Sequence, residues 1–192
     1  ECGLAKPPAD RIRNLIGRSL MQMMQQLAPS AGMGKHEELV ETYAAHYLNP
    51  NNRHMRLFPD VPPTLERLRE AGYWLSVATG KGRSGLNQAI AQTGTGDFWL
   101  ATACASECPS KPAPDMVWRL CDELGVMPSE SIVIGDTAFD LEMAAHAGAR
   151  GIGVTTGAHS RETLQSAPNI GILSCFGELE GFLQRQGSIE AV

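Results

Sequence analysis

Apolar residues recur at helical spacing in the first part of the chain, and then alternate between short continuous runs and helical segments. From Asp10 to Leu27 they fall three and four residues apart, which predicts one helix with a single buried stripe. A loop with Pro29, Gly32 and Gly34 follows, and residues 37–48 then repeat the helical pattern. We therefore expect the first part of the chain to be entirely helical.

The second part of the chain alternates predicted strands with predicted helices. It follows the Pro- and Asn-rich segment 49–63, which favours a boundary near Phe58 and divides the chain into parts 1–57 and 58–192. This alternation predicts an α/β fold with a parallel sheet and helices on both faces. The apolar runs predict strands at 73–79, 98–105, 131–136, 149–156 and 170–174, and helical patterns lie at 63–71, 84–92, 114–124, 139–147, after Ser160 and at 176–185.

Composition and charge narrow the class of protein. With 192 residues, of which 43% are apolar, the chain is long enough to bury a core. Its formal net charge is -5 and it has no long basic run, which argues against nucleic acid or an anionic membrane surface as a partner. No apolar stretch approaches the roughly 20 residues of a membrane-spanning helix, and residues 1–10 lack the pattern of a signal peptide. These features predict a cytoplasmic protein.

The cysteines and histidines form no metal-binding pattern. The five cysteines include no Cys-x-x-Cys pair, and an odd number with irregular spacing argues against a disulfide framework. Cys104 and Cys108 lie close together, but neither a second pair nor a suitably placed histidine supports a zinc site. Of the histidines, His159 falls in a loop on the side where parallel sheets bind ligands, and we keep it as a candidate.

Two polar segments follow predicted strands at their carboxyl ends. Thr79 ends one strand, and the Gly80-Lys81-Gly82 sequence behind it favours a cradle for an anion. The alternative is a plain turn, in which Thr79 bonds its own backbone and Lys81 is solvated. Lys111 lies in a later loop of this kind, where neighbouring prolines hold the backbone extended and aim the ammonium group. The alternative for Lys111 is an ordinary surface lysine.

The strongest signal is the stretch "SIVIGDTAFDLEMAAHAGA", in which a predicted strand ends at Asp136 and Asp140 lies about one helical turn further on. Two nearby carboxylates raise each other's cost of ionisation unless a cation lies beside them, and such oxygen ligands suit Mg²⁺. The alternative is that Asp136 caps the next helix and Asp140 is a solvated residue of its first turn.

Together, the segments "VATGK", "SKPAPDM" and "GDTAFDLEMAAHAGA" resemble the second, third and fourth motifs of the haloacid dehalogenase superfamily, in particular its phosphoglycolate phosphatase-like branch. The resemblance covers nearly the whole chain, and Asp10 to Leu57 is similar to the small helical cap of that branch. It implies a Rossmann-like core with a helical cap. The "GDT" sequence is closer to the Mg²⁺-dependent phosphatases than to the dehalogenases, whose corresponding motif is usually Ser-Asn.

The resemblance implies an activity and a role for each candidate residue. The implied reaction is hydrolysis of a small phosphorylated metabolite through an aspartyl-phosphate, with Mg²⁺ as cofactor. Thr79 and the Gly80 amide would bind the transferring phosphoryl group, and Lys111 would neutralise the nucleophile and the phosphate oxygens. Asp136 and Asp140 would form the metal site, Asp136 as a direct ligand and Asp140 by holding the metal's waters or Lys111 in place.

The first motif of that family, Asp-x-Asp, does not occur in these 192 residues. In the family it lies on the first strand, which is central in the sheet, and provides the nucleophile and the general acid and base. Without it, the strands of Thr79 and Asp136 would face each other with unpaired backbone groups. We expect the natural protein to carry this strand in roughly 20 to 30 residues upstream of Glu1. We also expect the 192-residue chain alone to be inactive and loosely structured.

Two other functions stay open at this point. A true truncation would be a catalytically inactive module that binds a phosphorylated ligand or a partner. A phosphomutase-type or phosphonate-cleaving relative would share the core motifs and differ in the cap. The cap sequence "RNLIGRSLMQMMQQL" names no substrate.

Overall fold

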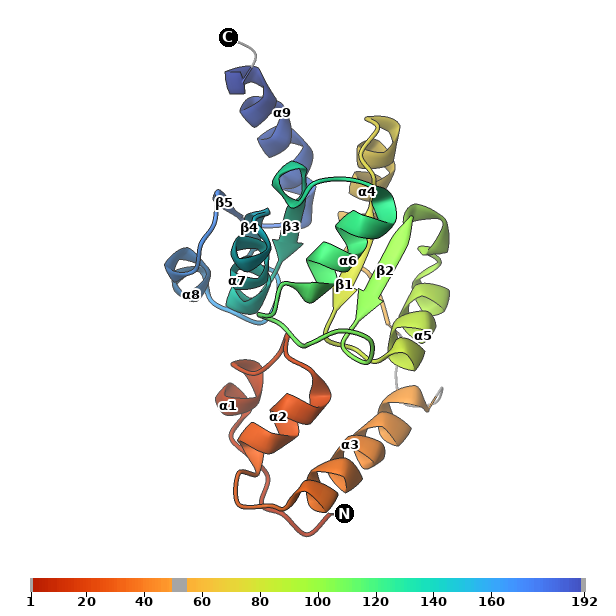
Figure 1. Ribbon diagram of the computed structural model, residues 1–192, viewed down its shortest axis with the longest axis vertical. Helices are drawn as coiled ribbons and strands as arrows, with labels where there is room; N and C mark the ends of the chain where they lie inside the picture. The colour runs from red at the N-terminus through yellow and green to blue at the C-terminus, as the bar shows by residue number, and fades with distance from the viewer. Residues whose placement is uncertain (1, 50–54, 191–192) are drawn as a thin grey trace.

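The computed structural model describes residues 2–49 and 55–190, and in it three helices precede an α/β part (Figure 1). The first three helices are α1 (Ala9–Arg13), α2 (Leu20–Leu27) and α3 (Met33–Leu48). The later helices are α4 (Val61–Glu70), α5 (Arg83–Thr93), α6 (Asp115–Leu124), α7 (Ala138–Ala147), α8 (Arg161–Ser166) and α9 (Leu179–Glu190). The strands are β1 (Ser76–Thr79), β2 (Ala101–Cys104), β3 (Ile132–Gly135), β4 (Arg150–Val154) and β5 (Gly171–Leu173).

The prediction of one helix from Asp10 to Leu27 is wrong, because residues 14–19 form a loop between α1 and α2. We call these residues the tip loop. Gly17 has a φ of 106° there, a left-handed conformation that a β-carbon disfavours. Ser19 is the N-cap of α2, and its hydroxyl accepts a hydrogen bond from the Gln22 amide at 3.3 Å. Of the expected buried stripe only Leu15, in the tip loop, is buried, and neither α1 nor α2, each described throughout, contains a buried residue.

The other predicted helices and all five predicted strands are confirmed, with boundaries that differ by a few residues. The second predicted helix begins earlier than expected, at Met33, because the backbone of Gly32 is extended and makes the N-cap. The strands are shorter than the apolar runs that predicted them. In the run 73–79, for example, only the last four residues pair with β2.

All strand pairs are parallel, as predicted, but the strands form two separate sheets. β1 pairs with β2, with Thr79 opposite Cys104, and β4 lies between β3 and β5, with Gly135 of β3 opposite Gly153. No strand in the described part of the chain lies between β1 and β3. This agrees with the expectation that the central strand of the sheet is not among these residues.

An apolar cavity of about 270 Å³ lies between the two sheets, and we call it the strand slot. Its walls include Leu75 and Ala78 on the β1 side, and residues 132–134 of β3 on the other. Leu68 of α4 and Leu179 of α9 also line it. The apolar residues of β3 are only half-buried beside the slot, whereas Ile152 of the neighbouring strand β4 is 0% exposed. β3 therefore has the sequence of an enclosed strand but is not enclosed on the slot side.

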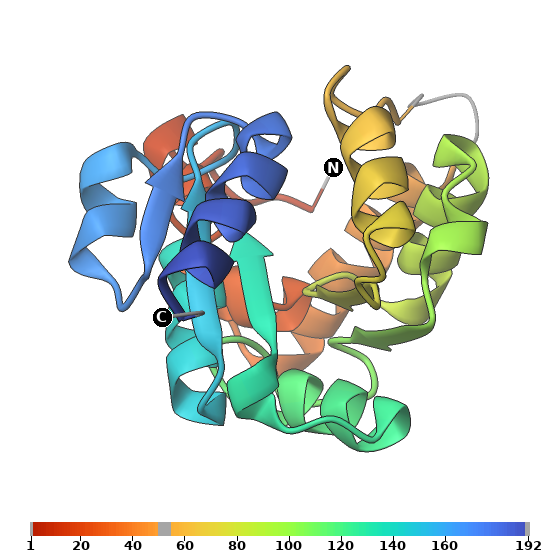
Figure 2. The same ribbon diagram turned by 90° about the horizontal axis from the view of Figure 1, so that it is seen from above.

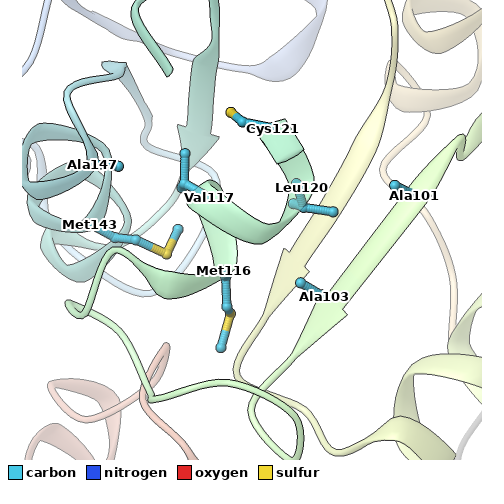
Figure 3. Packing of buried hydrophobic residues seen from close by; sticks show 8 residues of the cluster. All are labelled: Ala101, Ala103, Met116, Val117, Leu120, Cys121, Met143 and Ala147. Carbon is cyan, nitrogen blue, oxygen red and sulfur yellow. The ribbon is translucent and has the colours of Figure 1, made fainter. Parts of the chain in front are cut away.

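Helix α6 holds the two sheets together on one face. Figure 1 shows it in front of the interval between β1 and β3. Its buried face packs on β2 toward one side and on α7 toward the other, as Figure 3 shows for Ala101, Ala103, Met116, Val117, Leu120, Cys121, Met143 and Ala147. A second cluster, which includes Leu68, Ile152 and Leu179, packs α4 and α9 against the β3–β5 sheet. The view from above in Figure 2 shows the strands of the two sheets apart, with β3, β4 and β5 on one side and β1 and β2 on the other.

Candidate active site

The carboxyl ends of the strands lie at one edge of the α/β part and face helices α1–α3 (Figure 1). Thr79 is the last residue of β1, and Lys111 lies in the loop between β2 and α6. Asp136 follows β3 directly, and Asp140 lies in the first turn of α7. The four side chains predicted from the sequence therefore come to the edge at which parallel sheets bind ligands.

Lys111 and Asp140 form a buried ion pair. The Lys111 Nζ lies 2.6 Å from Asp140 Oδ1, and each side chain is 7% exposed. The same ammonium donates a second hydrogen bond to the carbonyl oxygen of Ala78 in β1, at 2.9 Å. Lys111 therefore bridges the end of one sheet to the helix that follows β3 in the other. The alternative of an ordinary surface lysine is wrong.

Asp140 is held on its other side by Thr137. Its Oδ2 accepts hydrogen bonds from the backbone amide of Thr137 at 3.1 Å and from the Thr137 hydroxyl at 2.6 Å. The bond from the Thr137 amide is part of a capping box in which Thr137 is the N-cap of α7. Asp136 is thus not the cap, and Asp140, at 5% exposure, is not a solvated residue. Both Asp140 oxygens are engaged by protein donors, which suits the expected role of holding Lys111 in place.

Asp136 is oriented by the loop that follows β4. Its Oδ2 accepts a hydrogen bond from the Ala158 amide at 2.8 Å, and its backbone carbonyl accepts one from the His159 amide at 3.2 Å. Gly157 is needed beside it, because a β-carbon at that position would overlap the Asp136 carboxylate. Within the described residues, Asp136 Oδ1 has no hydrogen-bond partner. One carboxylate oxygen is therefore available to a ligand at this edge.

Thr79 has the local turn bond that the sequence allowed as an alternative. Its Oγ1 accepts a hydrogen bond from the Lys81 amide at 3.2 Å. An oxygen that accepts in this way is oriented but keeps its own proton to donate. Lys81 is not simply solvated, because its Nζ donates to the Tyr47 hydroxyl of α3 at 2.7 Å. This bond joins the β1 loop to the helices that face it.

The tip loop contacts all three loops that carry these residues. A β-carbon on Gly80 would lie 2.7 Å from the carbonyl oxygen of Arg18 and 2.8 Å from that of Gly17, so Gly80 allows the tip loop to lie directly on the β1 loop. The Ser19 amide donates to the hydroxyl of Ser110, beside Lys111, at 2.7 Å. A β-carbon on Gly17 would lie 2.7 Å from the Thr137 hydroxyl.

Sequence analysis missed these tip-loop residues because it assigned them to a helix. The signal that could have found them is the "GRS" sequence in the middle of the pattern, since glycine followed by a possible serine N-cap is typical of a helix boundary.

His159, the candidate kept from the sequence, packs beside the site. Its ring meets Phe139 of α7 edge to face, with ring centroids 5.5 Å apart. Its Nδ1 accepts a hydrogen bond from the Ala138 amide at 3.0 Å. The geometry gives His159 a clear role in supporting the first turn of α7.

The residues at this edge fit part of a Mg²⁺ site. Mg²⁺ usually takes one or two protein carboxylates and keeps several waters. Asp136 offers one carboxylate oxygen, and the described residues contain no group of three or more His, Cys, Asp or Glu side chains that could hold a metal. The donor chemistry of Asp136 thus suits Mg²⁺.

Two further observations concern cysteines and membranes. All five cysteines are free thiols, and Cys104 is buried at the end of β2, with its sulfur 3.2 Å from the Ser106 hydroxyl. In the described part of the chain, no helix combines the length and the apolar character needed to cross a membrane.

The chain belongs to the haloacid dehalogenase-like hydrolases, because the model of that family matches residues 1–154. Its curated relatives include the phosphoglycolate phosphatase of Mannheimia succiniciproducens, 29% identical over 144 residues, and the pyrophosphatase PpaX of Bacillus velezensis, 29% identical over 133 residues. The two alignments cover 74% and 69% of this chain. They span 64% and 62% of the relatives' own length, so the chain corresponds to somewhat less than two thirds of each.

Solved structures of similar proteins agree with the fold. A haloacid dehalogenase-like hydrolase from Bacteroides fragilis is 26% identical with a TM-score of 0.82, and the match covers 92% of this chain and 85% of that protein. A predicted phosphoglycolate phosphatase from Haemophilus somnus is 20% identical with a TM-score of 0.83, covering 95% of this chain and 85% of that protein. The Rossmann-like α/β fold expected from the sequence is therefore confirmed.

Proposed function

We propose that this protein is a Mg²⁺-dependent phosphatase that hydrolyses a small phosphate monoester through an aspartyl-phosphate. The observation that carries the proposal is the buried Lys111–Asp140 pair, which lies at the same sheet edge as Thr79 and Asp136. Phosphoryl transfer asks mainly for positioned charge and hydrogen-bond donors, and this edge offers both. Membership of the family and relatives named as phosphatases support the same class of reaction.

Each candidate residue has a role in this proposal. The Thr79 hydroxyl, oriented by the Lys81 amide, donates to an oxygen of the transferring phosphoryl group, and the Gly80 amide assists it. The ammonium of Lys111 neutralises the oxygens of the same group, and the hydrogen bond to Asp140 Oδ1 holds that ammonium in place. The ion pair keeps the Lys111 ammonium in position before the substrate arrives, so no reorganisation is needed during the reaction.

Asp136 is the residue of this chain that would hold Mg²⁺, through the oxygen that lacks a protein donor. The metal would supply positive charge to the phosphoryl oxygens. The loop at Gly157 and Ala158 fixes the other Asp136 oxygen, and so keeps the carboxylate pointing at the site. Orientation of a ligand by such a neighbour is typical of metal sites.

The nucleophile belongs, in this proposal, to a further strand in the strand slot. The slot is bounded by the facing edges of β1 and β3, and its lining extends to Asp140 at the site. A parallel strand placed there would pair with both edges and join the two sheets. Its carboxyl end would then lie between Thr79 and Asp136. An Asp-x-Asp at that position, upstream of Glu1, would give the attacking carboxylate, the second metal ligand and the general acid and base.

In this proposal helices α1–α3 act as the cap. They lie within residues 1–57, the part of the chain that the sequence predicted to be the cap. They face the strand ends, and they contact the core through the tip loop and through the Lys81–Tyr47 hydrogen bond. A cap in this position excludes water from the reacting phosphate and selects the group attached to it.

Phosphate release from p-nitrophenyl phosphate tests the proposal. Two proteins are compared, the 192-residue chain and a longer protein that also carries the residues encoded immediately upstream of Glu1, which we call the extended protein. The extended protein should release phosphate with Mg²⁺ and lose this activity with a chelator, and the 192-residue chain should be inactive. Binding of the ester without turnover by the extended protein would favour the inactive binding module, and isomerisation of a sugar phosphate would favour a phosphomutase-type enzyme. Metal-dependent turnover by the 192-residue chain would mean that a carboxylate within it makes the attack.

A further inference from the structure

His159 is a buried polar residue with no role in the proposed reaction. It is 8% exposed and lies in the loop between β4 and α8. Its Nε2 is buried and has no hydrogen-bond partner within the described part of the chain. An apolar side chain would fill such a place without leaving a buried polar atom unpaired. Packing alone therefore does not explain a histidine at this position.

The other ring nitrogen of His159 holds the backbone that follows β3. Nδ1 accepts a hydrogen bond from the Ala138 amide at 3.0 Å. Ala138 is the first residue of α7, so its N–H group is one of those for which a helix has no acceptor of its own. The His159 side chain therefore supplies the acceptor that the helix cannot provide.

The same loop also holds Asp136, two residues before Ala138. The His159 amide donates to the Asp136 carbonyl oxygen at 3.2 Å, and the Ala158 amide donates to Asp136 Oδ2 at 2.8 Å. Together with the Nδ1 bond, these contacts fix the segment 136–138 through its backbone and through the Asp136 side chain. A shift of the His159 ring would therefore turn the Asp136 carboxylate, whose Oδ1 is the oxygen left for a ligand.

Phe139 keeps the His159 ring in place. The two rings meet edge to face, with centroids 5.5 Å apart. The guanidinium of Arg18, from the tip loop, lies 4.3 Å from the centroid of the same Phe139 ring. The imidazole is thus packed against a ring that is itself contacted by the tip loop, and this packing keeps Nδ1 aligned with the Ala138 amide.

From these contacts we infer that His159 is a positioning residue for Asp136. Its Nδ1 holds the Ala138 amide, and this bond sets the direction in which the Asp136 carboxylate faces the site. The inference rests on the proposed function, in which Asp136 is the residue that would hold Mg²⁺. Substitution of a residue that orients a metal ligand typically costs on the order of 10- to 10²-fold in metal affinity or activity.

The variants His159→Asn and His159→Leu separate positioning from packing. The two new side chains have the same branched shape. The Asn oxygen lies as many bonds from the backbone as Nδ1 and can accept from the Ala138 amide, whereas Leu has no acceptor.

In the extended protein, His159→Leu should raise the Mg²⁺ concentration for half-maximal phosphate release on the order of 10- to 10²-fold, and His159→Asn should stay within about threefold of wild type. Turnover at saturating Mg²⁺ should be similar in all three proteins. A packing role predicts the reverse order, because Leu suits a buried place better than Asn. That reverse order, or equal Mg²⁺ dependence of the two variants, would overturn the inference.

Hydrogen exchange gives a readout that does not depend on turnover. The amides of residues 136–138 should exchange faster in His159→Leu than in the wild-type extended protein, and His159→Asn should keep the slow exchange. Ser160→Ala is the control for a general loosening of the loop, since it removes the N-cap bond to the Thr163 amide in α8. It should change neither the Mg²⁺ dependence nor the exchange of residues 136–138. A matching effect of Ser160→Ala would mean that the loop acts as a whole, and the positioning role of His159 would be wrong.

Failure of the proposed function gives a different result, because the wild-type extended protein then releases no phosphate. Calorimetric binding of Mg²⁺ decides the role of His159 in that case. Weaker binding by His159→Leu than by His159→Asn supports the inference. Equal binding by the two variants, or no binding by the wild-type protein, overturns it.

Discussion

The ammonium of Lys111 lies 2.6 Å from the carboxylate of Asp140, and this buried pair connects the two sheets at the edge where the candidate residues meet. Ion pairs of this kind pay a large desolvation cost, so burial alone does not make them stabilising. Substitution of only one of the two residues is costly, because the other charge then stays buried without a counter-charge. The pair is therefore best explained by its effect on geometry, since it holds the Lys111 ammonium in one position.

Substitution of Lys111 should affect both turnover and folding. In the extended protein, Lys111→Met should reduce kcat on the order of 10² or more, as does loss of one preorganised donor elsewhere. It should also lower the free energy of unfolding by about 3–5 kcal/mol, because the Asp140 carboxylate loses its counter-charge. The double variant Lys111→Met/Asp140→Asn should regain part of that stability, since Asn can still accept from Thr137, but none of the activity. Recovery of activity in the double variant would contradict the assigned role of Lys111.

Substitution of Asp136 should act on metal dependence more than on stability. Asp136→Asn keeps the shape of the side chain and one oxygen, but it removes the negative charge that a divalent cation requires. We expect the Mg²⁺ concentration for half-maximal activity of the extended protein to rise at least tenfold, or turnover to be lost, with little change in the melting temperature. Asp122→Asn, at an exposed position of α6, serves as the control. Normal Mg²⁺ dependence in Asp136→Asn would remove this residue from the metal site.

A methyl group at Gly80 should push the tip loop away from the core. The added β-carbon would meet the carbonyl oxygens of Arg18 and Gly17 at 2.7 and 2.8 Å, and neither backbone group can move without displacing the loop. Gly80→Ala should therefore lower kcat/KM of the extended protein on the order of 10-fold or more and speed hydrogen exchange in residues 15–19. Gly82→Ala, in the same loop, has open space at its β-carbon and should leave both unchanged. Similar behaviour of the two variants would argue against close packing at Gly80.

The edge strand β3 should exchange its amide hydrogens faster than β4 in the 192-residue chain. β4 is paired on both sides, and β3 is paired on one. In the extended protein a strand in the slot would pair with the open edge, so exchange in residues 132–135 should slow toward that of β4. β4 is the internal control, because its pairing is the same in both proteins. Strong and equal protection of β3 and β4 in the 192-residue chain would count against the proposed extra strand.

Glu107 should make folding sensitive to acid. Hydrogen bonds from Arg83, with Arg119 also nearby at 3.0 Å, lower the pKa of the Glu107 carboxyl from 4.5 to about 2. Since the pKa in the folded state is the lower one, the carboxylate stabilises the fold above about pH 4.5, and this contribution is lost as the pH falls toward 2. At pH 7 the urea midpoint of the wild-type protein should be slightly higher than that of Glu107→Gln. The margin should be small because the group is solvent-accessible, and the difference should vanish at low pH. Glu70→Gln, an exposed position on α4, should show no such convergence.

The sequence by itself determined the order and type of the elements beyond residue 58 and the identity of the candidate residues. Those predictions rest on local rules, since apolar periodicity and residues at strand ends are properties of neighbouring positions in the chain. The apolar run 132–134 and the aspartates behind it could be recognised for this reason. The family resemblance and the open position between β1 and β3 followed from the same motifs.

Only the tertiary structure decided how these residues meet. Periodicity could not reveal the tip loop, because its apolar residues keep helical spacing while Gly17 and Ser19 break the helix to reach the core. Nor could it show that Asp140 bonds Lys111 and Thr137 rather than water, since Lys111 lies 29 residues away in the chain. The contact of Arg18 with Phe139 joins residues from the two parts of the chain. Such pairings depend on the packing of distant elements, and local sequence patterns carry no information about them.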